Sequence, residues 1–427
     1  MAQRKLLVIQ AAALGAGLLE ARGITKIAGM PVQSMRPAFP AVTCTSQAAL
    51  RTGTPCETNG MLANGLYFPD TAQSLFWCQS AALVRGPRFW DAYRAAGGRV
   101  GMYFFQQSLG ESVDEIVSPA PIHKHGGGMI LSLYQQPRNL LRWDAAVPLW
   151  RYWGPLASPK VGRGIVRNLA ERILRDDAPG LMMVYLPTLD YQLQRYGNAS
   201  PKTDRSFTEF LSQVRMLADT ARSKRYGVVL SGDYAIEDVL PQERHPVAFP
   251  NRLLVEAGLF RTREVAGMRY PDLFSSRAVA LCDHQCATVY CADLDAMASA
   301  KACLSALPQV ESLSEVPTAF AGASQHAPNR CAFSLLAKHG CWFAYPWWAL
   351  PKEAPDFATH VDIHSKPGFD PCELFFGRTP MTCSTDPTRI RGTHGHADLP
   401  VVFCTDTGIS AESTEALGAA IAAYLAK

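Results

Sequence analysis

The stretch FPAVTCTSQAALRTG, residues Phe39 to Gly53, has the pattern of a loop that turns into a helix with hydroxyl side chains at the junction. Thr43, Thr45 and Ser46 fall where the unpaired backbone N–H groups of a helix start point. These groups and the positive end of the helix dipole can bind an anion such as phosphate. The alternative is helix capping, because Ser and Thr are common N-cap residues before an apolar helix.

The composition is that of a folded protein with a full core. The chain has 427 residues, 48% of them hydrophobic, which is enough for two average domains or one large α/β domain with an insertion. A disordered chain is excluded. The net charge of +4 and the lack of any run of five Lys or Arg argue against a nucleic-acid polymer as partner. A small anionic ligand needs only a local positive site.

The twelve cysteines are scattered singly, without a CxxC pair. We expect most of them to be buried free thiols, and no structural zinc site around Cys282, Cys286 and Cys291.

The N-terminal run KLLVIQAAALGAGLL has the length of a signal-peptide core. Gln10 in its middle, and the lack of a small-x-small cleavage site before Glu20, favour a first buried strand over residues 6–10. No stretch of about 20 uninterrupted apolar residues follows, so we expect no membrane span. We expect a cytoplasmic protein.

Apolar strand patterns recur at residues 6–10, 100–105, 181–187 and 227–233. Helical periodicity lies between them, around 165–174 and from Ser206 onward, where Ser206 and Glu209 form a potential capping box. Strands that alternate with helices predict an α/β fold with a mainly parallel sheet and helices on both faces. Ligands of such sheets bind beyond the carboxyl ends of the strands. Residues 253–376 break this rhythm and are typical of a small inserted β-α-β subdomain.

The 39–53 segment resembles the nucleophile segment of the nucleotide pyrophosphatase/phosphodiesterase branch of the alkaline phosphatase superfamily. In that branch a Thr follows a Phe-Pro-x-x run, and a Thr-Gly pair ends the helix; Thr43 and Thr52-Gly53 take these positions here. The resemblance implies one alkaline-phosphatase-like catalytic domain over residues 1–427. Its fold would be a three-layer α/β/α sandwich with a mostly parallel central sheet, and residues 253–376 would be an inserted cap subdomain.

The resemblance extends to the two-metal site of the family, because the corresponding residues occur in the same order with matching spacing. Carried over, the first metal set is Asp190, Gln194 and His394. The second metal set is Gln10, Thr43, Asp233 and Tyr234.

Three of these seven positions depart from the family pattern. Gln10 stands for Asp, and both Gln194 and Tyr234 stand for His. A neutral amide oxygen is a poor zinc ligand, and only two carboxylates remain to neutralise two divalent ions. The resemblance implies a divalent metal, zinc in the first place. The number of bound ions stays open: the site could hold two ions, one ion bound by Asp190, Asp233 and His394, or none.

Each of these residues also has an ordinary interpretation. Asp190 can be a loop or cap residue, Asp233 can belong to a turn, and His394 can lie in a surface loop. Together with Thr43 and the ordered spacing, the set favours a functional site.

A second segment, THVDIHSKPGFDPCEL at residues 359–374, resembles a segment of bacterial phosphodiesterase-like members of the superfamily. This segment contains Asp362, His364 and Lys366. Lys366 could contact a phosphate, and His364 could supply an imidazole in place of the histidines that the family has at the positions of Gln194 and Tyr234. Asp283 and His284 in the CDHQC turn are the other candidates for that compensation. The alternatives are a rigid surface turn and a hairpin turn.

The resemblance implies a hydrolase of phosphodiester, pyrophosphate or phosphomonoester bonds in a small phosphorylated metabolite. Thr43 would attack phosphorus to give a covalent phospho-threonine, with a metal lowering the pKa of its hydroxyl. The alternative is a divergent member with a degraded metal centre that acts on, or only binds, a different anionic metabolite in a biosynthetic pathway. A third possibility, a non-catalytic partner in a biosynthetic assembly, has no positive support in the sequence.

Overall fold

The computed structural model describes residues 4–124, 129–130, 132–138, 140, 162–322, 324, 327–361, 365–374 and 382–427. The chain forms two compact units. Unit 1 consists of Met1–Asn59, Gln79–Ile236 and Ala397–Lys427, and unit 2 of Gly60–Cys78 and Glu237–His396. The subdomain predicted over 253–376 lies within unit 2.

Unit 1 is built around an eight-stranded sheet with the order β11-β8-β7-β12-β1-β13-β25-β4. Strand β1 (Lys5–Ala11) is the predicted first strand, and it pairs in parallel with β12 (Leu181–Leu186) and β13 (Tyr226–Gly232). β7 (Val100–Tyr103) and β8 (Glu115–Pro119) continue the parallel part. All residues of β12 are buried, as expected for a strand covered on both faces.

The edges of this sheet are antiparallel. β11 (Leu133–Gln136) pairs with β8, while β25 (Val401–Thr405) pairs with β13 and β4 (Gln33–Met35) with β25. The mostly parallel central sheet predicted from the alternation of strands and helices is therefore confirmed.

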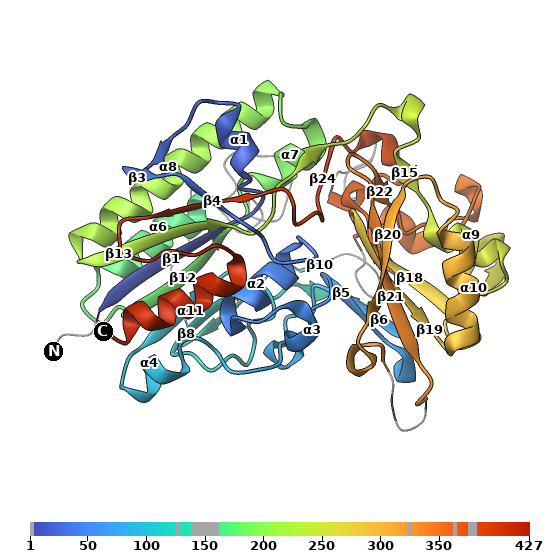
Figure 1. Cartoon of the computed structure of the whole chain (residues 1–427), viewed down its shortest axis with the longest axis horizontal. Helices are drawn as coiled ribbons and strands as arrows, with labels where there is room; N and C mark the ends of the chain where they lie inside the picture. Colours follow the sequence, from blue (N-terminus) through green and yellow to red (C-terminus); the bar gives the residue numbers. More distant parts are fainter. Residues whose placement is uncertain are drawn as a thin grey trace. The chain divides into compact units, whose positions relative to one another are not determined.

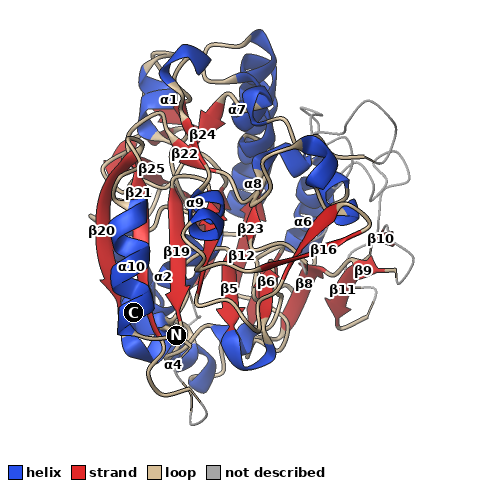
Figure 2. Cartoon of the chain, turned by 90° about the vertical axis from the view of Figure 1, so that its right-hand side faces the viewer, coloured by secondary structure: helices blue, strands red, loops and turns tan. Residues whose placement is uncertain are grey.

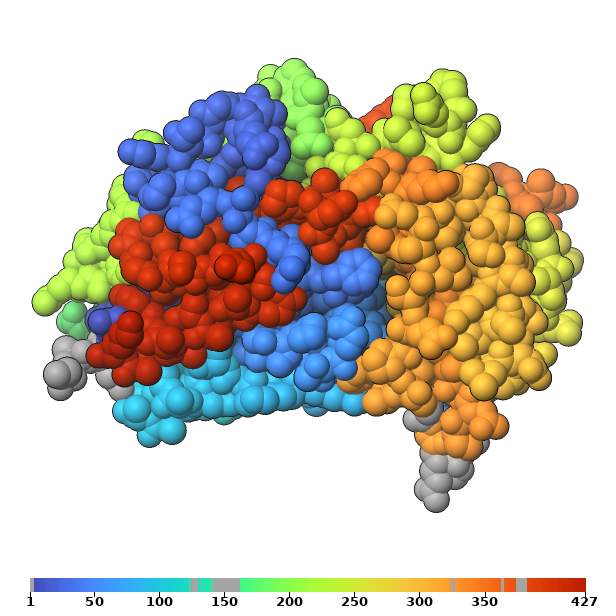
Figure 3. All heavy atoms as spheres, viewed as in Figure 1, coloured from blue at the N-terminus to red at the C-terminus, as the bar shows by residue number. Residues whose placement is uncertain are grey.

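Helices cover both faces of the sheet. α6 (Arg163–Leu174) and α8 (Pro201–Ser223) pack together on one face, and α2 (Thr43–Thr52) and α11 (Thr414–Leu425) on the other (Figures 1 and 2). This is the predicted three-layer α/β/α sandwich. The space-filling view shows the C-terminal residues, including α11, in red on the surface (Figure 3). The shorter elements of unit 1 are α1 (Ala16–Glu20), β2 (Lys26–Ile27), β3 (Met30–Pro31), α3 (Cys56–Asn59), α4 (Asp91–Ala95), β9 (Ile122–His123), β10 (Met129–Ile130) and α7 (Asp190–Tyr196).

Helix α8 begins earlier than the sequence pattern indicated. Pro201 occupies its first turn, and the Ser200 side chain accepts a hydrogen bond from the backbone N–H of Lys202. The predicted capping box is wrong, because Ser206 lies inside the helix and its hydroxyl donates to the Thr188 carbonyl. Glu209 instead pairs with Arg163 of α6.

Unit 2 has its own sheet and its own core. The five strands have the order β20-β21-β19-β18-β23, and α9 and α10 lie across one face (Figure 2). Buried residues of the hairpin formed by β5 and β6 join this core. The elements of unit 2 are β5 (Gly65–Phe68), β6 (Gln73–Phe76), β14 (Glu237–Asp238), β15 (Val247–Ala248), α9 (Pro250–Glu256), β16 (Thr262–Val265), β17 (Met268–Pro271), β18 (Ala278–Asp283), β19 (Cys286–Cys291), α10 (Leu294–Leu304), β20 (Val310–Val316), β21 (Cys331–Ala337), β22 (Trp342–Phe343), β23 (Gly368–Phe369) and β24 (Gly392–Thr393).

The twelve cysteines are free thiols, and most are buried, as expected from their scattered spacing. Among the described residues, none of the helices has both the length and the apolar character needed to cross a bilayer.

Candidate functional site

Thr43 is the first residue of helix α2, and it is buried. The N-cap is Val42, in extended conformation, and no side chain caps the helix start. The Thr43 hydroxyl is therefore not used for capping. The helix ends as predicted at Gly53, which has a φ of 66° and donates its N–H to the Ala49 carbonyl.

The Thr43 hydroxyl contacts a tyrosine that the sequence analysis did not single out. Tyr185 Oη lies 3.4 Å from Thr43 Oγ1 and donates a hydrogen bond to Asp233 Oδ2 over 2.9 Å. Because the Tyr185 proton is directed at Asp233, Tyr185 Oη can accept the Thr43 proton. A chain of contacts thus leads from Thr43 through Tyr185 to Asp233.

Asp233 is fully buried and accepts three hydrogen bonds. Besides Tyr185, the backbone N–H groups of Ala13 and Tyr234 donate to its Oδ1 over 3.0 and 2.8 Å. Burial raises the pKa of Asp233 well above its usual range, although these hydrogen bonds act in the opposite direction. A carboxylate with a raised pKa is a better proton acceptor, which fits its position at the end of the chain from Thr43.

Asp190 begins helix α7, and its Oδ1 accepts two hydrogen bonds. The Tyr234 hydroxyl donates over 2.9 Å, and Gln194 Nε2, one helical turn further on, donates over 2.7 Å. Burial raises the pKa of Asp190 from 3.8 to about 6, against the effect of these two donors. Burial and the Asp190 charge raise the pKa of Tyr234 well above its usual range, and a hydrogen bond with Thr43 lowers it. Tyr234 therefore connects Asp190 to Thr43.

Gln10 completes this cluster from the central strand. It lies beside Tyr185 and Ser231 in the register of the sheet, and its Nε2 donates to Ser46 Oγ on α2 over 3.2 Å. The structure thus brings together six of the seven residues that the family order predicted: Gln10, Thr43, Asp190, Gln194, Asp233 and Tyr234. Tyr185 was missed because a tyrosine in an apolar strand looks like a core residue; its signal is a hydroxyl in register with Gln10.

These six residues fit a zinc ion poorly. The Tyr234 hydroxyl and Gln194 Nε2 donate to Asp190, and the lone pairs that Gln10 and Gln194 present come from neutral amide oxygens, which zinc binds weakly. Only two of the six side chains can be anionic at neutral pH. The donor set of these six residues therefore differs from the carboxylates and imidazoles that zinc prefers.

His394, the seventh residue, belongs to unit 2. Its ring lies 3.9 Å from that of His284, and burial, followed by the proximity of His394, lowers the pKa of His284 well below its usual range. His284 and Gln285 form the two-residue turn between β18 and β19, so the hairpin interpretation is confirmed. Asp283 accepts hydrogen bonds from the backbone N–H and the side-chain amide of Asn64, and burial raises its pKa to about 7.

Lys366 is fully buried in unit 2. Its Nζ lies 3.1 Å from Glu373 Oε1 and donates to the His360 carbonyl over 2.6 Å, so its charge is compensated within the fold. Asp362 and His364 lie outside the described residues, and their roles stay predictions.

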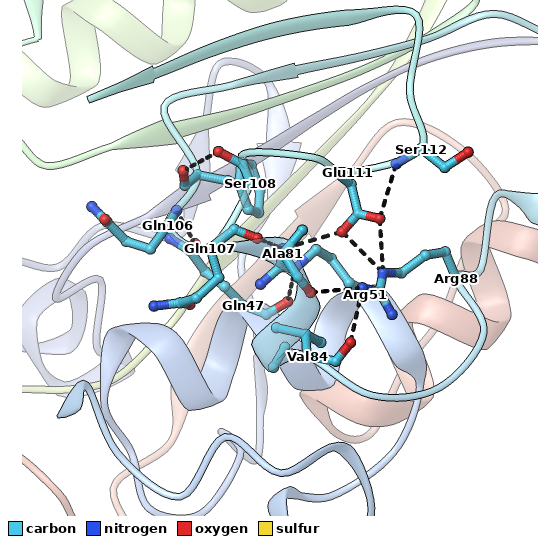
Figure 4. A network of polar contacts seen from close by, with 12 residues as sticks. Gln47, Arg51, Ala81, Val84, Arg88, Gln106, Gln107, Ser108, Glu111 and Ser112 are labelled. Atoms are coloured by element: carbon cyan, nitrogen blue, oxygen red, sulfur yellow. Dashed lines mark hydrogen bonds and ion pairs between the residues drawn. The ribbon is translucent and has the colours of Figure 1, made fainter. Parts of the chain in front are cut away.

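A second polar network holds helix α2 in place (Figure 4). Arg51, in the last turn of α2, is fully buried, and burial lowers its pKa to about 10. Its Nη1 donates to the Gln107 carbonyl over 2.8 Å, and Glu111 is shared between Arg51 and Arg88. Gln47 Oε1 accepts from the backbone N–H of Gln106 over 2.7 Å. The sequence signal for this network was an arginine four residues after Gln47 in helix α2.

The comparisons with known proteins agree with this fold. A model of the family Type I phosphodiesterase / nucleotide pyrophosphatase matches residues 8–370. Murine ectonucleotide pyrophosphatase / phosphodiesterase 5 is similar with 13% identity and a TM-score of 0.59 over 99% of this chain and 95% of that chain. An inactive form of the murine protein in complex with AMP gives the same values, and the human protein gives 12% and 0.58 over the same shares. No curated protein matches the chain.

Proposed function

The chain belongs to the Type I phosphodiesterase / nucleotide pyrophosphatase family, a family of phosphodiesterase-like hydrolases, and from this we propose that Thr43 is its nucleophile. The proposed reaction is hydrolysis of a phosphodiester or pyrophosphate bond in a small phosphorylated metabolite. The observation that carries the proposal is the buried chain of hydrogen bonds from Thr43 through Tyr185 to Asp233. A hydroxyl needs a proton acceptor to become a nucleophile, and this chain supplies one.

In the first step, Thr43 Oγ1 forms a bond to phosphorus, and the bond from phosphorus to the leaving oxygen breaks. The Thr43 proton passes to Tyr185 as the Tyr185 proton passes to Asp233. The helix dipole at the start of α2 favours the negative phosphoryl oxygens. In the second step, a water oxygen attacks phosphorus, and Thr43 leaves and recovers its proton along the same chain.

The substrate class follows from the family and from one relative. The murine relative has been captured with AMP, so we propose that a nucleoside monophosphate, or a group of similar size and charge, is part of the substrate.

The departures at Gln10, Gln194 and Tyr234 favour a second candidate function: binding an anionic metabolite without turnover. Twelve free thiols are stable in a reducing compartment, and on that ground we propose a cytoplasmic location.

The test is hydrolysis of a panel of nucleotide pyrophosphates, phosphodiesters and phosphomonoesters by the wild type and two variants. Thr43→Ala removes the nucleophile and should reduce kcat on the order of 10³-fold or more. Thr52→Ala is the matched control, because Thr52 is in the same helix and its hydroxyl bonds the Ala48 carbonyl. Retained turnover in Thr43→Ala contradicts the nucleophile. Saturable binding of the panel without turnover in the wild type supports the second candidate.

A further inference from the structure

Unit 2 carries a polar cluster that shares no residue with the seven family positions: Glu237, His339 and His396. Their candidate ligand atoms all lie within 4.8 Å of one another. His339 Nδ1 lies 3.0 and 3.1 Å from the two carboxylate oxygens of Glu237. The rings of His339 and His396 stack, with 4.0 Å between their centroids and 19° between their planes. Three residues with ligand chemistry thus converge from three separate segments.

The surroundings orient two of these side chains. His396 Nε2 lies 2.6 Å from the Ala337 carbonyl, which can only accept, so Nε2 carries the proton and Nδ1 carries the lone pair. Gln285 Nε2 donates to Glu237 Oε1 over 2.7 Å. Metal-binding histidines typically donate their other ring N–H to a carbonyl or carboxylate, and metal-binding carboxylates are typically held by further hydrogen bonds. Both features are present here.

We propose that Glu237, His339 and His396 bind a divalent transition-metal ion of the zinc type. One carboxylate and two imidazoles are ligands that Zn²⁺ prefers, and the three candidate ligand atoms lie close enough for small side-chain rotations to bring them to one ion. His396 is buried, whereas the side chain of His339 is 45% exposed, which leaves solvent access for a fourth ligand. Glu311 Oε2, 3.9 Å from His396 Nε2, adds negative charge next to the cluster.

The position of the cluster gives the metal a structural role. Glu237 and His396 are the first and last residues of the long segment of unit 2. Glu237 itself lies in β14, which pairs with β24. His339 follows β21, which pairs with β19 and β20. A bound ion therefore fastens both ends of this segment to its central sheet.

The experiment is a Zn²⁺ titration of the full chain, freed of metal by a chelator, in competition with a chromogenic chelator. The wild type should bind one Zn²⁺ that His339→Ala and Glu237→Gln each weaken at least about 100-fold. Gln285→Leu, which removes only the donor to Glu237, should weaken binding about 10- to 100-fold. His339→Gln is the substitute if His339→Ala does not fold, as judged by circular dichroism.

The control is Asp190→Asn, which alters the cluster in unit 1 and should leave this Zn²⁺ affinity unchanged. Cysteine thiolates can also bind zinc, so the change on substitution is the readout rather than the total metal bound. The proposal is overturned if the wild type has no saturable site, if the site survives His339→Ala, or if Asp190→Asn removes it.

Discussion

The hydroxyl of Tyr234 donates a hydrogen bond to Asp190 over 2.9 Å. Tyr185 does the same for Asp233. Both buried carboxylates are therefore held by phenol groups, and both phenols contact Thr43. This arrangement links Thr43 to two carboxylates that differ in their hydrogen-bond partners.

Tyr185→Phe should reduce kcat by about 10²- to 10⁴-fold, because it removes the hydroxyl that connects Thr43 to Asp233 and keeps the ring. The measurement is steady-state kinetics on the best substrate of the panel. The control is Tyr226→Phe, which makes the same change in β13, where the hydroxyl bonds the Pro179 carbonyl. Equal kinetics for the two variants contradict the proton path.

Asp190→Asn should change how stability depends on pH. The native pKa of Asp190 is raised from 3.8 to about 6, so the native state holds this proton more tightly than the unfolded chain does. The resulting stabilisation is fully present below about pH 4 and is lost as the pH rises through about 6. Relative to the wild type, the Asn variant should gain up to about 3 kcal/mol of unfolding free energy between pH 4 and 7.

Urea unfolding at several pH values measures this difference. Asp176→Asn, at a fully exposed carboxylate, should show no such pH-dependent gain. A constant difference between wild type and Asp190→Asn across this range would show that Asp190 is not destabilised by burial.

Glu111→Gln should lower the unfolding free energy by about 3 to 5 kcal/mol, because it leaves the charges of Arg51 and Arg88 without their shared carboxylate. Asp219→Asn, which breaks an exposed pair with Arg222, should change it by less than about 1 kcal/mol. Chemical denaturation of both variants measures these two changes in unfolding free energy. A small effect of Glu111→Gln means that the network in Figure 4 does not stabilise α2.

Restoring the family residues should create a metal site in unit 1. Gln10→Asp, Gln194→His and Tyr234→His together supply one carboxylate and two imidazoles, so bound zinc should increase. Elemental analysis is best done in the His339→Ala background, where the site proposed in unit 2 is removed. No gain in zinc means that the three restored side chains do not converge on one ion.

Much of the fold was predictable because its signals are local. Strand β1 follows from a short apolar run, and the end of α2 follows from Thr52-Gly53. The start of α8 was misplaced by five residues, from Pro201 to Ser206, because periodicity alone was used and the Ser-Pro start was overlooked. Unit 2 was only partly recognised, because residues 60–78 join 237–396 through contacts between distant parts of the chain.

Some residues of the candidate site could likewise be predicted from the sequence, whereas others could be recognised only from the structure. Thr43, Asp190 and Asp233 were predicted as site residues because the family order names them, although the sequence alone allowed an N-cap, a loop or cap residue, and a turn. Tyr185 and Arg51 were missed because their roles depend on the residues that they contact in the fold. Neither the tyrosine in the apolar strand β12 nor the arginine in helix α2 belongs to a recognisable sequence motif. Only the contacts with Asp233 and Glu111 reveal what they do.

The hydrogen-bond donors on Asp190 and Asp233 are covalently part of the chain. A metal ion exchanges with its surroundings, so its occupancy falls when the free ion is scarce, and a chelator can empty its site. The hydroxyls of Tyr185 and Tyr234 do not dissociate from the protein, so they are in place whenever the chain is folded. The contacts that link Thr43 to Asp233 and Asp190 should therefore not depend on the supply of free zinc.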